Sequence, residues 1–110
     1  MNNGSFDEII HSPNRLKICA FLAPTSSVDF PVLRDMLQVS DSVLSKHIKH
    51  LEKAGYVKQR KGSANGRKRS WVYLTTAGQE AFRNHINELK RLIDGSIEVN
   101  SNSSLHLITD

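Results

Sequence analysis

Basic side chains that could bind a polyanion are concentrated in one stretch of this chain. Between Lys46 and Arg69 there are nine lysines and arginines against one acidic residue, Glu52. The whole chain of 110 residues carries only +4, so the residues outside this stretch are net negative. Charge gathered in this way, rather than spread for solubility, is typical of a protein that binds nucleic acid.

Cysteine and the histidines of the basic stretch offer weaker chemistry. Cys19 is the only cysteine and lies in an apolar run, so we expect a small core residue and neither a disulfide nor a cysteine-based metal site. His47 and His50 could share a metal, but no cysteine pair or carboxylate stands at a matching spacing. We therefore expect no metal and no cofactor.

Two further patterns resemble catalytic or switching sites. Packing is the expected role of His11 and His85, and a switch driven by pH or metal is the alternative. The glycine-rich segment 62–68 has the wrong spacing for a phosphate-binding loop and leads into a strand. No serine, histidine and acid are placed as a triad, so the chain is not expected to be an enzyme.

Two helices are predicted ahead of the basic stretch. Ser12 and Pro13 open the first, which should run to about Ala23 and be mostly buried. After a stub of strand at 28–30, Pro31 opens the second helix. Only two residues then separate it from the next helix, which is a helix-turn-helix spacing.

The third helix, 40–54, is predicted to carry the first half of the basic stretch. Ser40 is its cap, and Leu44, Ile48 and Leu51 recur at the spacing of a buried helix face. Gly55 supplies the left-handed residue that ends it. The residues expected to point outward are Ser42, Ser45, Lys46, Lys49 and Lys53.

A β-hairpin should carry the second half. Two alternating runs, 56–61 and 70–75, are rich in aromatic and β-branched residues and are joined by a long basic loop at 62–69. The cations Arg67, Lys68 and Arg69 would lie at its tip. Trp71 and Tyr73 are expected to pack the hairpin onto the body.

A last helix and a tail complete the chain. Thr75 or Thr76 caps the helix, and Phe82, Ile86, Leu89 and Ile93 form an apolar stripe that two copies could use to pair. The Ser/Asn-rich segment 95–110 is expected to be a flexible tail. Alternatively, its alternating apolar residues around 97–99 and 105–107 could form a terminal hairpin.

These expectations describe one small, mainly α fold with a β-hairpin wing, a winged helix-turn-helix followed by a dimerisation helix. The segments are a DNA-binding domain at 6–75, a dimerisation helix at 76–94 and a tail at 95–110. The longest apolar stretch, Ile18 to Ala23, is far too short to cross a bilayer, so a cytoplasmic protein is expected.

The sequence Leu44-Ser-Lys-His-Ile-Lys-His-Leu-Glu-Lys-Ala-Gly-Tyr-Val57, with Tyr73-Leu-Thr-Thr-Ala-Gly78, closely resembles the small winged-helix regulators related to the MarR and ArsR families. The resemblance covers about Ile9 to Ile93. It implies that the third helix enters the major groove, that the wing at 58–72 lies on the backbone or minor groove, and that the terminal helix pairs two subunits. The extra helices that bracket a ligand pocket in full-length MarR proteins are lacking, so an effector is not assigned.

The start of a recognition helix reaches base edges, so direct readout is assigned to Ser40, Asp41, Ser42, Ser45 and Lys46. For Asp41 a favourable place at the helix N-terminus is the alternative. Lys49 and Lys53 should meet phosphates, and the three cations of the wing should hold the backbone or a narrow minor groove.

The function expected is that of a sequence-specific transcriptional regulator, a repressor, which binds a near-palindromic duplex as a homodimer. The rival interpretation is a winged helix used as a protein-interaction or RNA-binding module.

Overall fold

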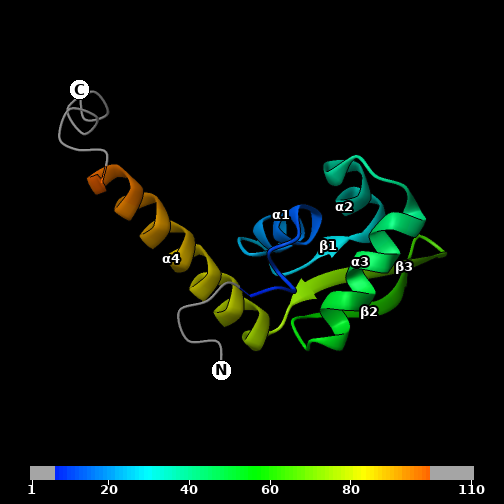
Figure 1. Ribbon diagram of the computed structural model, residues 1–110. Helices are drawn as coiled ribbons and strands as arrows, with labels where there is room; N and C mark the ends of the chain where they lie inside the picture. Colours follow the sequence, from blue (N-terminus) through cyan, green and yellow to red (C-terminus); the bar gives the residue numbers. More distant parts are fainter. Residues whose placement is uncertain (1–6, 100–110) are drawn as a thin grey trace.

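The computed structural model describes residues 7–99, which form four helices and one three-stranded antiparallel sheet (Figure 1). The elements in chain order are α1 (Pro13–Leu22), β1 (Val28–Asp29), α2 (Phe30–Leu37), α3 (Asp41–Lys53), β2 (Val57–Ala64), β3 (Arg67–Leu74) and α4 (Thr76–Val99). The sheet order is β1-β3-β2, so the hairpin pairs with the short strand that precedes α2. The predicted fold class, a winged helix-turn-helix, is confirmed.

A single core lies between the helices and the sheet. Its fully buried apolar side chains come from α1, α2, α3, β2, β3 and the segment before α1, and the largest are Ile10, Ile18, Leu22, Leu33, Leu44, Ile48, Leu51, Val57 and Val72. Cys19 belongs to this core, as expected. The first helix is less buried than predicted, because Ala20 of α1 and Ala23, which follows its last residue, are exposed.

The turn between α2 and α3 is held by a left-handed residue. Gln38 has φ 60°, and its N–H donates to the carbonyls of Arg34 and Asp35, which closes α2. The turn therefore spans three residues, one more than predicted. Ser40 then caps α3 as expected, because its Oγ accepts from the Val43 N–H at 3.2 Å.

The wing is a tight hairpin, and the prediction of a long loop at 62–69 is wrong. Both strands continue through that segment and pair from Val57↔Leu74 to Ala64↔Arg67. Only Asn65 and Gly66 form the turn, with φ of 56° and 76°. This residue pair accepts the two left-handed positions that a two-residue hairpin turn requires.

Strand register also corrects the expected packing of Trp71 and Tyr73. Val72 and Leu74 are the buried residues of β3, and they alternate with Trp71 and Tyr73. Because successive side chains of a strand point to opposite faces, Trp71 and Tyr73 lie half-buried on the face away from the core.

Helix α4 starts at the place where α3 ends and then projects away from the body (Figure 1). The Thr75 N–H donates to the Tyr56 carbonyl at 2.9 Å, and Thr75 Oγ1 donates to the Gly55 carbonyl at 2.6 Å. Thr75 Oγ1 also accepts from the Gly78 N–H at 2.9 Å, so Thr75, rather than Thr76, is the cap. We call these contacts, with the residues that make them, the α3–α4 joint.

The end of α4 differs from the prediction. The helix continues to Val99, past the expected boundary at 94, because Gly95 takes no positive φ and lies within the helix. A glycine inside a helix costs about 1 kcal/mol, which a long helix can absorb. The expectation of a flexible tail is therefore wrong for 95–99, as is the alternative of a strand at 97–99, while the rest of the tail, 100–110, lies outside the described residues.

Candidate nucleic-acid interface

The recognition helix α3 presents one cationic face to solvent. Leu44, Ile48 and Leu51 turn inward and are at most 1% exposed. The opposite face carries Ser42, Lys46, Lys49 and Lys53, all of which are exposed, and Ser45 is exposed beside them. A groove of about 590 Å³ runs along this surface, lined by Lys46, Lys49, His50, Glu52 and Lys53. The predicted outward residues are therefore brought together on one surface.

Two residues at the start of α3 are already engaged within the protein. Ser40 Oγ caps the helix and lies 3.2 Å from Ser42 Oγ. Asp41 accepts from Arg34 Nη1 of α2 at 2.9 Å, and Arg34 Nε also binds Asp35 at 3.0 Å. These two carboxylates raise the pKa of the Arg34 guanidinium. In this structure Asp41 thus connects the two helices of the helix-turn-helix.

The wing carries its exposed cations beside the turn. Arg67 and Lys68 are exposed at the start of β3. They line a groove of about 450 Å³ between the wing and the start of α2, together with Phe30, Pro31, Lys61, Arg69 and Ser70. No acidic residue lines it, so this groove is suited to an anion.

Arg69 lies apart from the other two wing cations. Its Nη1 donates to Asp29 Oδ2 at 3.1 Å, and both side chains are largely covered. Asp29 belongs to β1, so this ion pair fastens the central strand to the edge strand. The expected position of Arg69 at the hairpin tip is wrong, because the tip is formed by Asn65 and Gly66.

Arg60 and Trp71 form a stacked pair that the sequence analysis did not single out. The two residues are paired across β2 and β3, and the Arg60 guanidinium carbon lies 4.8 Å from the centre of the indole ring. A Cβ on Gly62 would come within 3.0 Å of the same ring. Trp71 thus covers the outer face of the wing and holds a cation there.

Of the remaining titratable groups identified from the sequence, Cys19 and His85 are buried, whereas His11 is exposed. Burial raises the pKa of the Cys19 thiol to about 12, with Asp7 adding to the effect. His85 is 1% exposed, and its Nε2 lies 3.3 Å from His11 Nδ1. Among the described residues, no group of three or more histidines, cysteines, aspartates or glutamates is arranged to hold a metal ion.

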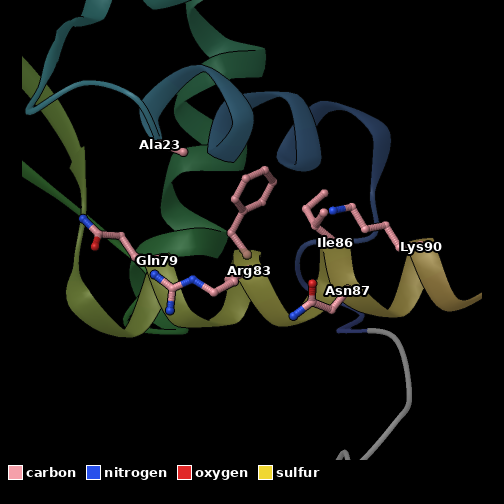
Figure 2. A pocket seen from close by; sticks show the side chains of 7 residues that line it. Ala23, Gln79, Arg83, Ile86, Asn87 and Lys90 are labelled. Atoms are coloured by element: carbon pink, nitrogen blue, oxygen red, sulfur yellow. The ribbon is translucent and has the colours of Figure 1, made fainter.

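The apolar stripe on α4 packs against the body at its start and is exposed to solvent further along. Phe82 packs against the core, whereas Ile93 is 55% exposed and its neighbour Leu92 is 58% exposed. A groove of about 360 Å³ lies between the end of α1 and α4, lined by Ala23, Gln79, Phe82, Arg83, Ile86, Asn87 and Lys90. Figure 2 shows Ile86 and Lys90 on the side of α4 that faces α1. The apolar surface therefore extends beyond the body along the projecting helix.

Within the described part of the chain, no helix is both long and apolar enough to span a membrane.

Sequence comparison places the chain among winged-helix proteins. Residues 14–93 match the winged helix DNA-binding domain family. An uncharacterised protein of Methanocaldococcus jannaschii is 34% identical over 85 residues, which cover 77% of this chain and 92% of that protein.

Solved structures agree with this assignment. A transcriptional regulator homologue of Pyrococcus horikoshii OT3 is 35% identical, with a TM-score of 0.77, over 81% of this chain and 88% of that one. S. aureus MepR, solved in complex with DNA, shares the fold at 12% identity with a TM-score of 0.69, over 93% of this chain and 82% of MepR. MarR also shares the fold, with a TM-score of 0.74 at 14% identity, over 93% of this chain and 74% of MarR. The resemblance expected from the sequence is confirmed: this chain belongs to the winged helix DNA-binding domain family and has the fold of the MarR-like regulators.

Proposed function

We propose that this chain is a sequence-specific DNA-binding transcriptional regulator, a repressor, that acts in the cytoplasm as a homodimer. The observation that carries the proposal is the continuous cationic surface of α3. Lys46, Lys49 and Lys53 are exposed on the helix face opposite the core, and the wing adds the exposed cations Arg67 and Lys68. Such a surface attracts a polyanion, and the convex shape of a helix fits the major groove.

The proposal assigns different roles to the two parts of this surface. The segment 40–54 enters the major groove, where Ser42, Ser45 and Lys46 reach base edges and Lys49 and Lys53 bind phosphates. Ser40 and Asp41 stay among the readout residues, and their internal contacts mean that each must share or exchange a hydrogen bond when DNA binds. The wing, 58–72, lies on the backbone or the minor groove.

The wing cations do not contribute in the same way. Arg67 and Lys68 are exposed and ready to contact the backbone. Arg69 can do so only after it releases Asp29. We therefore assign the strongest hold of the wing to the two residues next to the turn.

Pairing of two copies through Phe82, Ile86, Leu89 and Ile93 follows from the exposed part of α4. A dimer would place its two recognition helices in successive major grooves, about 34 Å apart, and would read a near-palindromic site. MepR, which shares this fold, was solved in complex with DNA, and this supports DNA as the partner of this chain. The repressor role is what the resemblance to MarR-like proteins implies.

Duplex selection followed by binding measurements tests the proposal. Genomic fragments retained by the protein would be compared with a random duplex and with RNA of the same length, each across a salt series. We expect affinity for duplex DNA to fall steeply with salt and one sequence to be bound at least about a thousandfold more tightly than random DNA. A shallow salt dependence, or tighter binding of RNA, would contradict the proposal. Derepression of a reporter behind the selected site, when the protein is removed, tests the repressor role.

Point variants test the division of roles. Ser45→Ala or Lys46→Ala should weaken discrimination between the selected and the random duplex by about 1–3 kcal/mol, since base contacts are lost. Arg67→Ala should weaken both duplexes alike, because a phosphate contact carries no sequence information. Equal effects on discrimination from all three variants would show that the division is wrong.

A further inference from the structure

A cation from α1 lies between two histidines of the recognition helix. Arg15 Nη1 is 3.3 Å from Nδ1 of His47 and 3.3 Å from Nδ1 of His50. Arg15 Nε donates to the Ile9 carbonyl at 2.6 Å, which fixes the guanidinium. We call these three side chains the Arg15 cluster.

The Arg15 cluster is rich in hydrogen-bond donors. A guanidinium has no acceptor, so both Nδ1 atoms must accept, and each neutral ring then carries its proton on Nε2. Burial lowers the pKa of His47, and the charge of Arg15 lowers it further, in agreement with a neutral ring. Within residues 7–99 no acidic side chain forms an ion pair with Arg15. The cluster thus carries a positive charge and two ring N–H donors, of which that of His50 belongs to an exposed side chain.

The position of the cluster is next to the proposed DNA-binding face. His50 lines the groove that also contains Lys46, Lys49, Lys53 and one acidic residue, Glu52. On the opposite flank of α3, Glu52 accepts a hydrogen bond from Gln59 of the wing at 3.3 Å. The wing and the Arg15 cluster therefore lie on opposite sides of the recognition helix, as do the two phosphate backbones that border a major groove.

We propose that Arg15, His47 and His50 form a phosphate-binding site that holds the DNA backbone on the side of α3 away from the wing. The inference rests on the proposed DNA-binding function and extends it to α1, which contributes no residue to the interface described above. Arg15 supplies the charge, and the two rings, oriented by Arg15, supply N–H donors.

The test compares two variants of the full chain that lose the same charge. Arg15→Gln should weaken binding to both a random duplex and the selected duplex about tenfold, because a charge-assisted contact is lost. The slope of log affinity against log salt should become shallower by about 0.9, the value for one phosphate. Lys17→Gln removes a charge from an exposed position two residues further along α1 and should change affinity less than about twofold, with an unchanged slope.

Failure of this inference can be distinguished from failure of the proposed function. If the wild type binds duplex DNA with a steep salt dependence and Arg15→Gln behaves like Lys17→Gln, the phosphate site is overturned. A lower melting temperature of Arg15→Gln with an unchanged salt slope would also overturn it, since that is the result of a purely structural contact. Wild-type protein that shows no salt-dependent duplex binding would instead contradict the proposed function.

A second variant keeps the test independent of α1 packing. His50 is exposed, so His50→Ala should remain folded and should bind both duplexes about fivefold more weakly, through loss of one hydrogen bond. In the Arg15→Gln background the same change should have a smaller effect, because Arg15 no longer orients the ring. An unchanged affinity of His50→Ala, or strictly multiplicative effects of the two changes, would contradict a shared site.

Discussion

At the scale of single residues, His85 combines burial with a titratable ring. Its Nδ1 lies 3.4 Å from the Asp7 N–H, and its Nε2 lies 3.3 Å from His11 Nδ1. Asp7 Oδ2 in turn accepts from the Tyr56 hydroxyl at 2.6 Å, and burial with this bond raises the pKa of Tyr56 to about 12. Burial lowers the pKa of His85, and His11 lowers it further, while Asp7 opposes the shift. The folded protein therefore favours the neutral form of this ring.

The pH dependence of stability follows from that shift. Unfolding returns the pKa of His85 to its ordinary value of 6.5, so below this pH the unfolded chain binds the extra proton. We expect the free energy of unfolding to be fully retained above about pH 6.5 and to decrease as the pH falls, until the lower folded pKa is passed. Urea denaturation of the wild type and of His85→Gln measures this, and the variant should show a shallower dependence.

His47 should also contribute to the pH dependence of stability. Its pKa is also lowered, so it contributes with the same sign, and part of the pH dependence should persist in His85→Gln. In the double variant with His47→Gln, the free energy of unfolding should depend even less on pH. A pH dependence equally steep in the wild type and in His85→Gln would mean that the ring does not change its protonation on unfolding.

At the scale of elements, the contact between the end of α3 and the start of α4 leaves no room for a side chain at one position. A Cβ added to Gly78 would overlap the Tyr56 carbonyl and would lie 3.0 Å from the Leu74 side chain. The carbonyl belongs to the backbone, so relief requires the two helices to separate. Gly78 is therefore required by close approach rather than by its φ.

Two glycine substitutions on the same helix should have opposite effects. Gly78→Ala should lower the free energy of unfolding by about 1–3 kcal/mol, as overpacking does. Gly95→Ala adds a methyl group with nothing within 4 Å and should raise the free energy of unfolding by up to about 1 kcal/mol, through helix propensity. Chemical denaturation of both variants measures this. If Gly78→Ala were as stable as the wild type, this would contradict the claim that the α3–α4 joint leaves no room for a side chain at Gly78.

The sequence allowed the helices of the body to be predicted because their signals are local. Ser40, Leu44 and Gly55 specify the cap, the buried face and the end of α3 by chain spacing alone. The wing was predicted too short because the glycine-rich segment was interpreted as a loop. Counting outward from Asn65-Gly66 as a two-residue turn would have paired Arg60 with Trp71.

Other features depend on contacts between distant segments and could not be predicted. The Arg69–Asp29 ion pair joins residues 40 positions apart, and Arg15 meets His50 across 35 positions. Their geometry is decided by how α1 and β1 pack on the rest of the domain. The left-handed Gln38 is similar, since glutamine has no preference for that conformation and the turn imposes it.

At the scale of the whole molecule, α4 is the one helix that leaves the body within the described residues (Figure 1). Its exposed apolar residues contribute nothing visible to the fold of a single copy, which supports the proposal that a second copy covers them. The substitution Ile93→Glu should therefore leave the fold intact and disrupt the dimer.

Ile93→Glu and Arg91→Glu form a matched pair for this prediction. Arg91 is 73% exposed and lies on the helix face opposite the stripe, two residues from Ile93. Sedimentation equilibrium should show monomers for Ile93→Glu and dimers for both Arg91→Glu and the wild type, with the Ile93 variant losing affinity for the palindromic duplex. Dimers in all three proteins would show that this stripe does not pair the subunits.

The α3–α4 joint has a consequence for the DNA sequence itself. Thr75 and Gly78 fix the start of α4 to the end of α3, so in a dimer paired through α4 the angle between the two recognition helices is set partly by these hydrogen bonds. Adding one base pair between half-sites rotates one of them by about 34° around the duplex axis, since a helical turn has about 10.5 base pairs. If the α3–α4 joint keeps this angle constant, the dimer cannot rotate one recognition helix by the same amount. The helical phase of the operator, as much as its base sequence, would then define the site.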